Sequence, residues 1–321
     1  MSTLNTSTFE GKSLPLIVQP GDQKSLEANR DAIMAIVETE LPKFGALLFR
    51  GFEVDGVQGF EAFADWFKGE QIQYDYGSTP RTQIKGKVYT STEYPPDQTI
   101  PLHNEMAYTT QWPMMLWFYS QIVAEQGGET PIADSREIYK RIRPEIRDRF
   151  EKEGLLYVRN YRVGMDVPWQ KVFNTEDRGR VEEICRQSKI EFEWRGRRGD
   201  ELRTRQSCQA CAKHPHTGED VWFNQAHLFH ISNLEDRFRK AMLTIYKEED
   251  LPRNVYYGDG STIEDDILNE VRAVMEDVKV AFPWRKDDVM MMDNMLAAHG
   301  RHPFKGNRKV AVSMAQPYSL S

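Results

Sequence analysis

The sequence predicts a mixed α/β protein whose core is rich in β-strands and is decorated by helices. Short apolar runs between turn residues dominate the middle and the end of the chain, for example "GALLFRGF" from Gly45 and "VMMMD" from Val289. Such runs are typical of buried strands, whereas helical periodicity is limited to the start of the chain and to segments between strands. Because strands and helices do not alternate regularly, a parallel βαβ architecture is not expected.

The first half of the chain contains two predicted amphipathic helices and three strands. Residues 24–41 form the first helix, in which these apolar residues recur on one side: Leu26, Ile33, Met34, Ile36, Val37 and Leu41. "GALLFRGF" is the first strand, and the second helix is predicted from the spacing of Phe60, Phe63, Trp66 and Phe67. The segment "MLWFYSQIVAEQGGETPIADS" predicts a strand, a turn and a strand. Asp134 or Ser135 is expected to cap a charged helix that continues to about Phe150.

The second half has strand character between residues 189 and 232, with "HTGED" as a turn before "VWFNQ". The clearest helix is expected to begin at Thr262, because apolar residues recur at helical spacing from Ile263 to Val278. Two further strands, "VMMMD" and "RKVAVSMAQP", are expected after Pro283.

Composition excludes several classes of protein. The chain has 321 residues, of which 40% are hydrophobic and 11% aromatic, enough for a sizeable core. Its net charge of −7 argues against a general binder of nucleic acid. No apolar run reaches the roughly 18 residues of a membrane span, the N-terminus lacks an export signal, and three cysteines are a poor basis for a disulfide scaffold. We therefore expect a reduced, cytoplasmic protein with neither a membrane nor a nucleic-acid partner.

Three residues have the right chemistry for a metal site. In "PLHNEMAY", an extended chain would project His103 and Glu105 from one face. His299, in "DNMLAAHGRHPF", is expected in a loop just beyond the strand at 289–292, where it could face a cavity. Two histidines and one carboxylate on one face of a nonheme Fe(II) ion leave positions open for a chelating cosubstrate and for dioxygen. An isolated H-x-E is common by chance, and a loop histidine bonded to the backbone is the simpler interpretation of His299.

Several segments, in the same order, resemble the TauD/TfdA-like family (taurine dioxygenase, clavaminate synthase-like) of Fe(II)/2-oxoglutarate-dependent oxygenases. They are "GALLFRGF", "YTSTEYP", "PLHNEMAY", "GGETPIADS", "HPHTGEDVWFNQAHLFH" and "DNMLAAHGRHPFKGNRKVAV". The chain is most similar to the branch of amino-acid hydroxylases from peptide natural-product pathways. The resemblance implies a double-stranded β-helix, or jelly roll, with helices outside. It also implies one oxygenase domain over residues 1–321, in which an insertion at about 135–250 contributes a lid or substrate region.

The resemblance also assigns roles to residues. His103, Glu105 and His299 match the family's iron ligands, and Arg308 in "GNRKVAV" matches the arginine that binds 2-oxoglutarate through its guanidinium fork. Thr130 in "GGET" matches the threonine beside that arginine. A surface ion pair for Arg308 and a β-branched strand position for Thr130 are the alternative interpretations.

The separation of nine residues between His299 and Arg308 is shorter than in several family members, which implies a loop deletion. Arg301 and Lys309 are rivals for the anion-binding role, and Arg301 could contact the substrate instead. Asn224 and His227 are polar groups amid apolar neighbours and are candidates for the lining of the substrate cavity. Tyr108 is a candidate for a pocket wall or, alternatively, for a core aromatic residue.

By resemblance, the reaction consumes Fe(II)-bound 2-oxoglutarate and O2 and hydroxylates an unactivated C–H bond of a small amino acid, free or bound to a carrier protein. Glu105 favours hydroxylation, because halogenating relatives lack this carboxylate. Desaturation, cyclisation and sulfonate cleavage remain alternative outcomes. A third alternative is a noncatalytic jelly-roll protein with zinc at "SCQACAKHPH", which offers Cys208, Cys211, His214 and His216. That spacing is unusual for zinc, so a free thiol pair is preferred.

Overall fold

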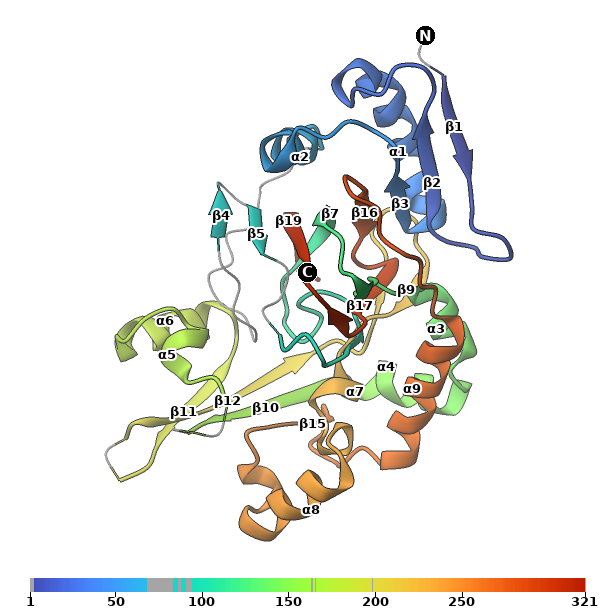
Figure 1. Cartoon of the computed structure of the whole chain (residues 1–321). Coiled ribbons are helices and arrows are strands. Elements are labelled where there is room, and N and C mark those ends of the chain that lie inside the picture. The colour runs from blue at the N-terminus through green and yellow to red at the C-terminus, as the bar shows by residue number, and fades with distance from the viewer. Residues whose placement is uncertain are drawn as a thin grey trace.

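The largest sheet joins strands from both ends of the chain (Figure 1). The structure, a computed structural model, describes all residues except 1–2, 68–82, 86–87, 91–93, 163, 165, 198 and 321. The predicted motif "YTSTEYP" lies partly outside the described residues. In spatial order the strands of this sheet are β1 (Leu4–Ser7), β2 (Leu16–Pro20), β3 (Ala46–Phe49), β16 (Val289–Asp293), β7 (Trp112–Ile122), β19 (Lys309–Tyr318), β5 (Val88–Thr90) and β4 (Gln83–Lys85). Neighbours are antiparallel, apart from the parallel pair β2 and β3.

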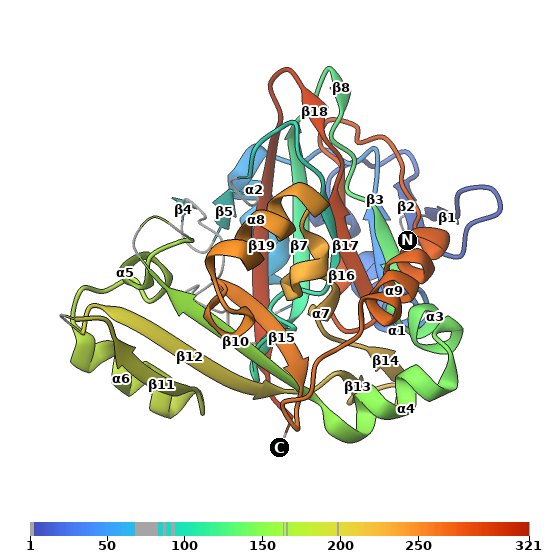
Figure 2. The same ribbon diagram turned by 90° about the horizontal axis from the view of Figure 1, so that it is seen from below.

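A smaller antiparallel sheet lies against one face of the large sheet. Its strands, in order, are β6 (Ile100–His103), β17 (Ala297–Arg301) and β9 (Ile132–Asp134). Ile132 and Ala297 share one buried cluster with Leu116 and Phe118 of the large sheet. At one end the short strands β8 (Gln126–Gly127) and β18 (Phe304–Lys305) pair and extend this layer (Figure 2).

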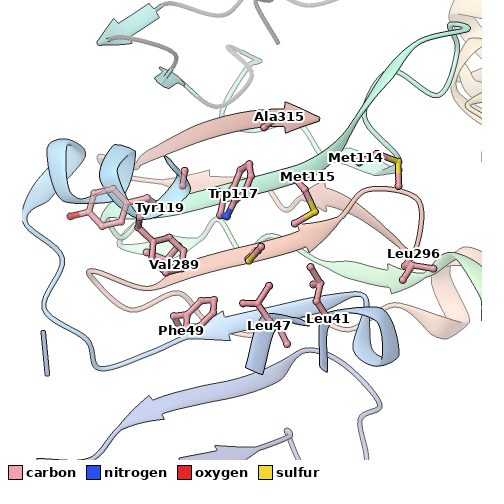
Figure 3. Close-up of a cluster of buried hydrophobic side chains, with 14 of the residues drawn as sticks. Leu41, Leu47, Phe49, Met114, Met115, Trp117, Tyr119, Val289, Leu296 and Ala315 are labelled. Atoms are coloured by element: carbon pink, nitrogen blue, oxygen red, sulfur yellow. The ribbon is translucent and has the colours of Figure 1, made fainter. Parts of the chain in front are cut away.

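The apolar strands of the large sheet bury both faces, which explains why their sequences are continuously hydrophobic. Successive side chains point to opposite sides of a strand. Leu48 and Phe118 therefore face the small sheet, whereas Leu47 and Trp117 pack against helices on the other side (Figure 3). The helical segments on that side are η1 (Glu27–Asn29), α1 (Arg30–Phe44) and α2 (Gly56–Asp65).

The chain between β9 and β16 forms the rest of the molecule. Helices α3 (Ser135–Arg141), α4 (Pro144–Glu153) and α9 (Asp265–Val278) cover the outer face of the small sheet. A four-stranded sheet contains β11 (Glu191–Arg195), β12 (Glu201–Cys208), β10 (Leu155–Tyr161) and β15 (Arg253–Tyr257). The remaining elements are α5 (Trp169–Val172), α6 (Arg178–Gln187), the hairpin β13 (Cys211–Lys213) and β14 (Asp220–Trp222), α7 (Ala226–Phe229), η2 (Ile231–Asn233), α8 (Asp236–Ile245) and η3 (Glu248–Asp250). Figure 1 shows the four-stranded sheet extending away from the two layers.

Most predicted elements are present. Several helices differ from the prediction at their ends, and the segment expected to have strand character up to residue 232 becomes helical at α7. The single charged helix expected from Asp134 to Phe150 is wrong: α3 ends at Arg141 and α4 begins at Pro144. Proline has no backbone N–H and disfavours helical geometry in the residue before it, so it starts a helix rather than continuing one. Asp134 does cap α3, because its carboxylate accepts a hydrogen bond from the Arg136 N–H at 2.8 Å.

Two other helices begin later than expected. α9 starts at Asp265 rather than Thr262, and α1 starts at Arg30 after a turn of 3₁₀-helix and continues to Phe44. Within the described ranges, we find no helix that combines the length and the hydropathy needed to cross a bilayer.

Candidate active site

Three side chains singled out in the sequence meet between the two sheets. His103 ends β6 and His299 lies in β17, where the two residues are directly opposed, with ring centroids 4.5 Å apart. Strand alternation turns both imidazoles inwards, because the neighbouring Leu102 and Ala298 pack on the outer face. The Glu105 Oε2 atom is 3.9 Å from His299 Nε2. One ligand atom from each residue lies within 4.8 Å of the other two.

The local structure differs from the prediction at two of these residues. β6 ends at His103, so Glu105 reaches the site through a turn in which Met106 has a φ of 57°, not through strand alternation. His299 lies in a strand rather than in a loop. The register of β6 and β17 shifts between His299 and Arg301, where Gly300 approaches the Ile100 carbonyl so closely that a Cβ would lie 2.6 Å from the oxygen. Such bulges re-aim side chains, and here both flanking residues line the same pocket.

The donor set fits an iron(II) ion. His103 Nδ1 lies 2.9 Å from the Pro101 carbonyl oxygen. Because a carbonyl only accepts, Nδ1 carries the proton and the Nε2 lone pair is left for a metal. Two imidazoles and one carboxylate are the ligands found in nonheme Fe(II) oxygenases. In the parts of the chain that the structure describes, no other group of three or more His, Cys, Asp or Glu side chains converges in this way.

Arg308 and Thr130 lie in the same pocket as the two histidines. Arg308 directly precedes β19, and its Nε donates to the Gly128 carbonyl at 2.8 Å while Nη2 lies 3.4 Å from the Thr130 hydroxyl. The indole N–H of Trp284 donates to that hydroxyl at 3.0 Å. A hydroxyl oxygen has two lone pairs and one proton, so Thr130 is left with its O–H to donate.

Two arginines, Arg301 and Arg308, line the pocket. Burial lowers the pKa of Arg308 to about 10, and the nearby Arg301 guanidinium adds to this effect while Glu129 opposes it. Arg308 remains charged at neutral pH, because its pKa is still about three units higher. The pocket therefore combines three candidate metal ligands with a half-buried cation that has a hydroxyl donor beside it, an arrangement suited to a small carboxylate.

Arg301 and Lys309, the alternative candidates for binding the anion, have different environments from Arg308. The Arg301 guanidinium donates to three backbone carbonyls, those of Tyr94, Pro95 and Gln98, at 2.6–3.0 Å. Arg301 also lines the pocket, whereas Lys309 is exposed. The geometry thus favours Arg308 for binding an anion in the pocket.

Three sequence-predicted substrate residues lie outside this pocket. The Asn224 amide donates to Ala210 O and accepts from Ala226 N–H, which fixes the turn into α7. Tyr108 packs against the rings of Tyr157 and Phe229 in a neighbouring cavity. His227 Nε2 donates to the Leu102 carbonyl at 2.8 Å, on the far side of β6 from the histidine pair.

The burial of His227 predicts a pH effect on stability. Burial lowers its pKa to about 4, with smaller contributions from Arg272 and His103, against an unfolded value near 6.5. Between these values only the unfolded chain binds the proton, so the free energy of unfolding falls as the pH is lowered through this window. His227→Gln should reduce the loss of stability between pH 7 and pH 5 by about 2 kcal/mol, measured by urea denaturation. Equal losses in the two proteins would contradict the prediction.

The alternative zinc site is not assembled. Cys208 donates its S–H to the Tyr108 carbonyl at 3.3 Å, and His214 is paired with Asp293 at 2.9 Å. Burial raises the pKa of the Cys208 and Cys211 thiols, which disfavours the thiolates that zinc requires. All three cysteines of the chain are free.

Sequence reasoning missed several pocket residues. Val310 and Val312 line the pocket, and period-two spacing from Arg308 would have placed all three on one face of the last strand. Phe118, whose ring centroid is 5.0 Å from that of His299, faces inwards by the same rule. Trp284 comes from a loop that has no periodic pattern, and only the structure brings it to Thr130.

Comparisons with known proteins identify a family and relatives that match most of the chain. The family model for "Taurine catabolism dioxygenase TauD, TfdA family" matches residues 11–314. The chain is 40% identical over 281 residues to the dapdiamide synthesis protein DdaC of Enterobacter agglomerans, covering 88% of this chain and 85% of DdaC. It is 31% identical over 327 residues to a clavaminate synthase-like protein of Arabidopsis thaliana, covering 96% of this chain and 95% of the relative.

A solved structure is similar over the same length. PvcB of Pseudomonas aeruginosa matches with a TM-score of 0.55 and 15% identity, covering 98% of this chain and 91% of PvcB. A second PvcB structure describes that protein as an Fe, alpha-ketoglutarate dependent oxygenase from an isonitrile synthetic pathway. The chain therefore belongs to the TauD, TfdA family of dioxygenases and is an oxygenase that uses Fe(II), 2-oxoglutarate and O2.

Proposed function

We propose that His103, Glu105 and His299 hold the iron and that Arg308 and Thr130 hold the distal carboxylate of 2-oxoglutarate. The observation that carries the proposal is the meeting of these five side chains, from distant parts of the chain, around the space between the two sheets. Iron held by these residues would supply the activation of O2, with 2-oxoglutarate oxidised to succinate and CO2 and one oxygen atom inserted into the substrate.

The protein's own groups bind, orient and exclude water. The Arg308 fork and the Thr130 hydroxyl donate to the carboxylate, and bonds from Arg308 to Gly128 and from Trp284 to Thr130 hold both donors in place. Phe118 and the two valines of β19 form apolar walls that keep water from the reacting carbons.

Gly128 gives Arg308 the space for this position, and its substitution tests the arrangement. Gly128 has a φ of +77°, and a Cβ there would lie 2.9 Å from Arg308 Cδ. Gly128→Ala is therefore expected to displace the guanidinium and raise the KM for 2-oxoglutarate at least about 10-fold, since one lost charge-assisted hydrogen bond costs about 1.5–3 kcal/mol. Metal binding should be unchanged. Gly260→Ala is the control, because Gly260 has a similar φ of +84° but no atom within 4 Å of the added Cβ; equal KM changes would point to backbone strain alone.

The proposed architecture is a double-stranded β-helix in which the large and small sheets are the two layers. The pairing of strands from both ends of the chain and the sandwiched apolar cluster support it. We place all residues in one oxygenase domain and propose that the insertion at about residues 135–250 contributes a lid or substrate region. The cytoplasm is the proposed compartment, because free thiols persist there.

The proposed reaction is hydroxylation of an unactivated C–H bond in a small amino acid or a derivative, free or attached to a carrier protein. The names of two similar proteins support a biosynthetic substrate, since DdaC is a dapdiamide synthesis protein and PvcB belongs to an isonitrile synthetic pathway. Glu105 supports hydroxylation over halogenation because its carboxylate would take the metal position that chloride needs. Desaturation, ring closure and sulfonate cleavage are the competing outcomes, and Arg301 is the pocket residue proposed to contact the substrate.

The test is succinate release from a panel of amino acids, free and carrier-bound, with product masses measured for each active substrate. A product that gains one oxygen supports hydroxylation, and a loss of two hydrogens indicates desaturation or ring closure. If no amino acid stimulates succinate release while anaerobic Fe(II) and 2-oxoglutarate still give a visible charge-transfer band, the substrate class is wrong and the oxygenase class stands.

A further inference from the structure

Asn294 lies in the turn that joins β16 to β17 and is fully buried. Its side chain binds the backbone of Glu105 on both sides: Oδ1 accepts from the Glu105 N–H at 2.7 Å, and Nδ2 donates to the Glu105 carbonyl at 2.9 Å. Nδ2 also donates to the Pro113 carbonyl at the start of β7, at 2.8 Å. One amide therefore holds both backbone polar groups of Glu105.

A second contact ties the residue between His103 and Glu105 to the same turn. The Asn104 side chain donates to the Asn294 carbonyl at 2.6 Å and to the Ser135 hydroxyl at 3.0 Å. Glu105 lies outside any strand, so these bonds take the place of the ladder bonds that hold the two histidines.

Hydrogen bonds made by Asp293 and His214 stabilise the turn between β16 and β17. Asp293 Oδ1 accepts from the backbone N–H groups of Met295 and Leu296 at 2.9 and 3.1 Å, and Oδ2 lies 2.9 Å from His214 Nε2. His214 Nδ1 accepts from the backbone N–H of Thr217 at 3.1 Å, so Nε2 is the nitrogen that donates to Asp293. His214, the first histidine of the "HPH" motif, therefore has a structural role that does not involve zinc: it donates a hydrogen bond to Asp293.

We propose that Asn294 is a positioning residue that sets the Glu105 carboxylate relative to His299. The turn that contains Asn294 leads directly into β17, so it couples a carboxylate held by a turn to a histidine held by a strand. The inference rests on the proposed role of Glu105 as a metal ligand. Its physical basis is that groups which orient a ligand raise metal affinity without touching the metal.

The test measures metal binding by the apoprotein, without turnover. Asn294→Ala is expected to weaken Mn(II) binding, followed by electron paramagnetic resonance, about 10- to 100-fold. At saturating Co(II), the visible spectrum of the variant should differ from that of the wild type, because the carboxylate is no longer held in one orientation. Circular dichroism at the same temperature establishes that the variant is folded.

Asn160→Ala is the matched control. Asn160 is also buried and its side chain also takes part in three hydrogen bonds, to Glu249 O, Leu251 O and the Arg203 guanidinium, but it lies on β10. The Asn160→Ala variant should be less stable than the wild type but should keep the wild-type Mn(II) affinity and Co(II) spectrum. If Glu105→Ala weakens Mn(II) binding and folded Asn294→Ala does not, the positioning role is wrong and the metal site stands. If Glu105→Ala itself leaves Mn(II) affinity unchanged, the proposed site is wrong as well.

Discussion

His299→Ala is expected to abolish succinate formation and to weaken metal binding more than about 100-fold. Loss of a group that only orients a ligand costs about 10- to 100-fold in affinity, so loss of a ligand should cost more. His299 lies opposite His103 and 3.9 Å from the Glu105 carboxylate. The fold should persist, because the strand pairing of β17 uses backbone groups.

Metal titration of the apoprotein and succinate release with 2-oxoglutarate measure this effect, with circular dichroism as the test of folding. His216→Ala is the control, because His216 is exposed in the β13–β14 turn and should bind metal like the wild type. A folded His299→Ala protein that still binds iron and forms succinate would remove His299 from the site.

Arg308→Ala is the second substitution for which we expect a large effect, in this case on the binding of 2-oxoglutarate. It should raise the KM for 2-oxoglutarate at least about 30-fold, because removing one partner of a buried, hydrogen-bonded charge pair costs about 2–5 kcal/mol. Metal binding in the absence of 2-oxoglutarate should not change, since the guanidinium donates hydrogen bonds to Gly128 and Thr130 rather than to the three proposed metal ligands. Arg308→Lys should recover only part of the affinity, because an ammonium cannot form the planar fork.

Lys309→Ala is the control for charge alone, because Lys309 is the adjacent cation and is exposed. The KM of the Lys309→Ala variant for 2-oxoglutarate should match that of the wild type. An unchanged KM in Arg308→Ala would transfer the role to Arg301 or Lys309, and a matching set of variants at those positions would decide between them.

Much of the candidate site could be predicted from the sequence, because it depends on residue chemistry. Imidazole and carboxylate ligands, a guanidinium for a carboxylate and a hydroxyl beside it are recognisable as residue types, and the resemblance placed them at numbered positions. The buried strands were predictable for a related reason: both faces of β7 and β16 are covered, so their sequences are apolar throughout.

The rest of the candidate site could not be predicted from the sequence, because it depends on long-range packing. Local pattern predicted an extended segment through Glu105 and a loop at His299, and both were wrong because the turn at Asn294 and the pairing of β17 with β6 override local preference. The cavity residues proposed from the "WFNQAHLFH" segment could not be placed, since burial in the core and exposure to a pocket have the same sequence pattern.

By itself, the sequence determined which chemical groups this oxygenase possesses and which strands are buried, because composition and periodicity are local properties. Only the tertiary structure decided that His103 and His299 face each other and that a turn rather than a strand presents Glu105. It also decided that the indole N–H of Trp284 donates a hydrogen bond to the Thr130 hydroxyl. The physical reason is that these relations join residues separated by up to about two hundred positions. Strand register and buried hydrogen bonds set such distances, and neither is encoded in any short stretch of the chain.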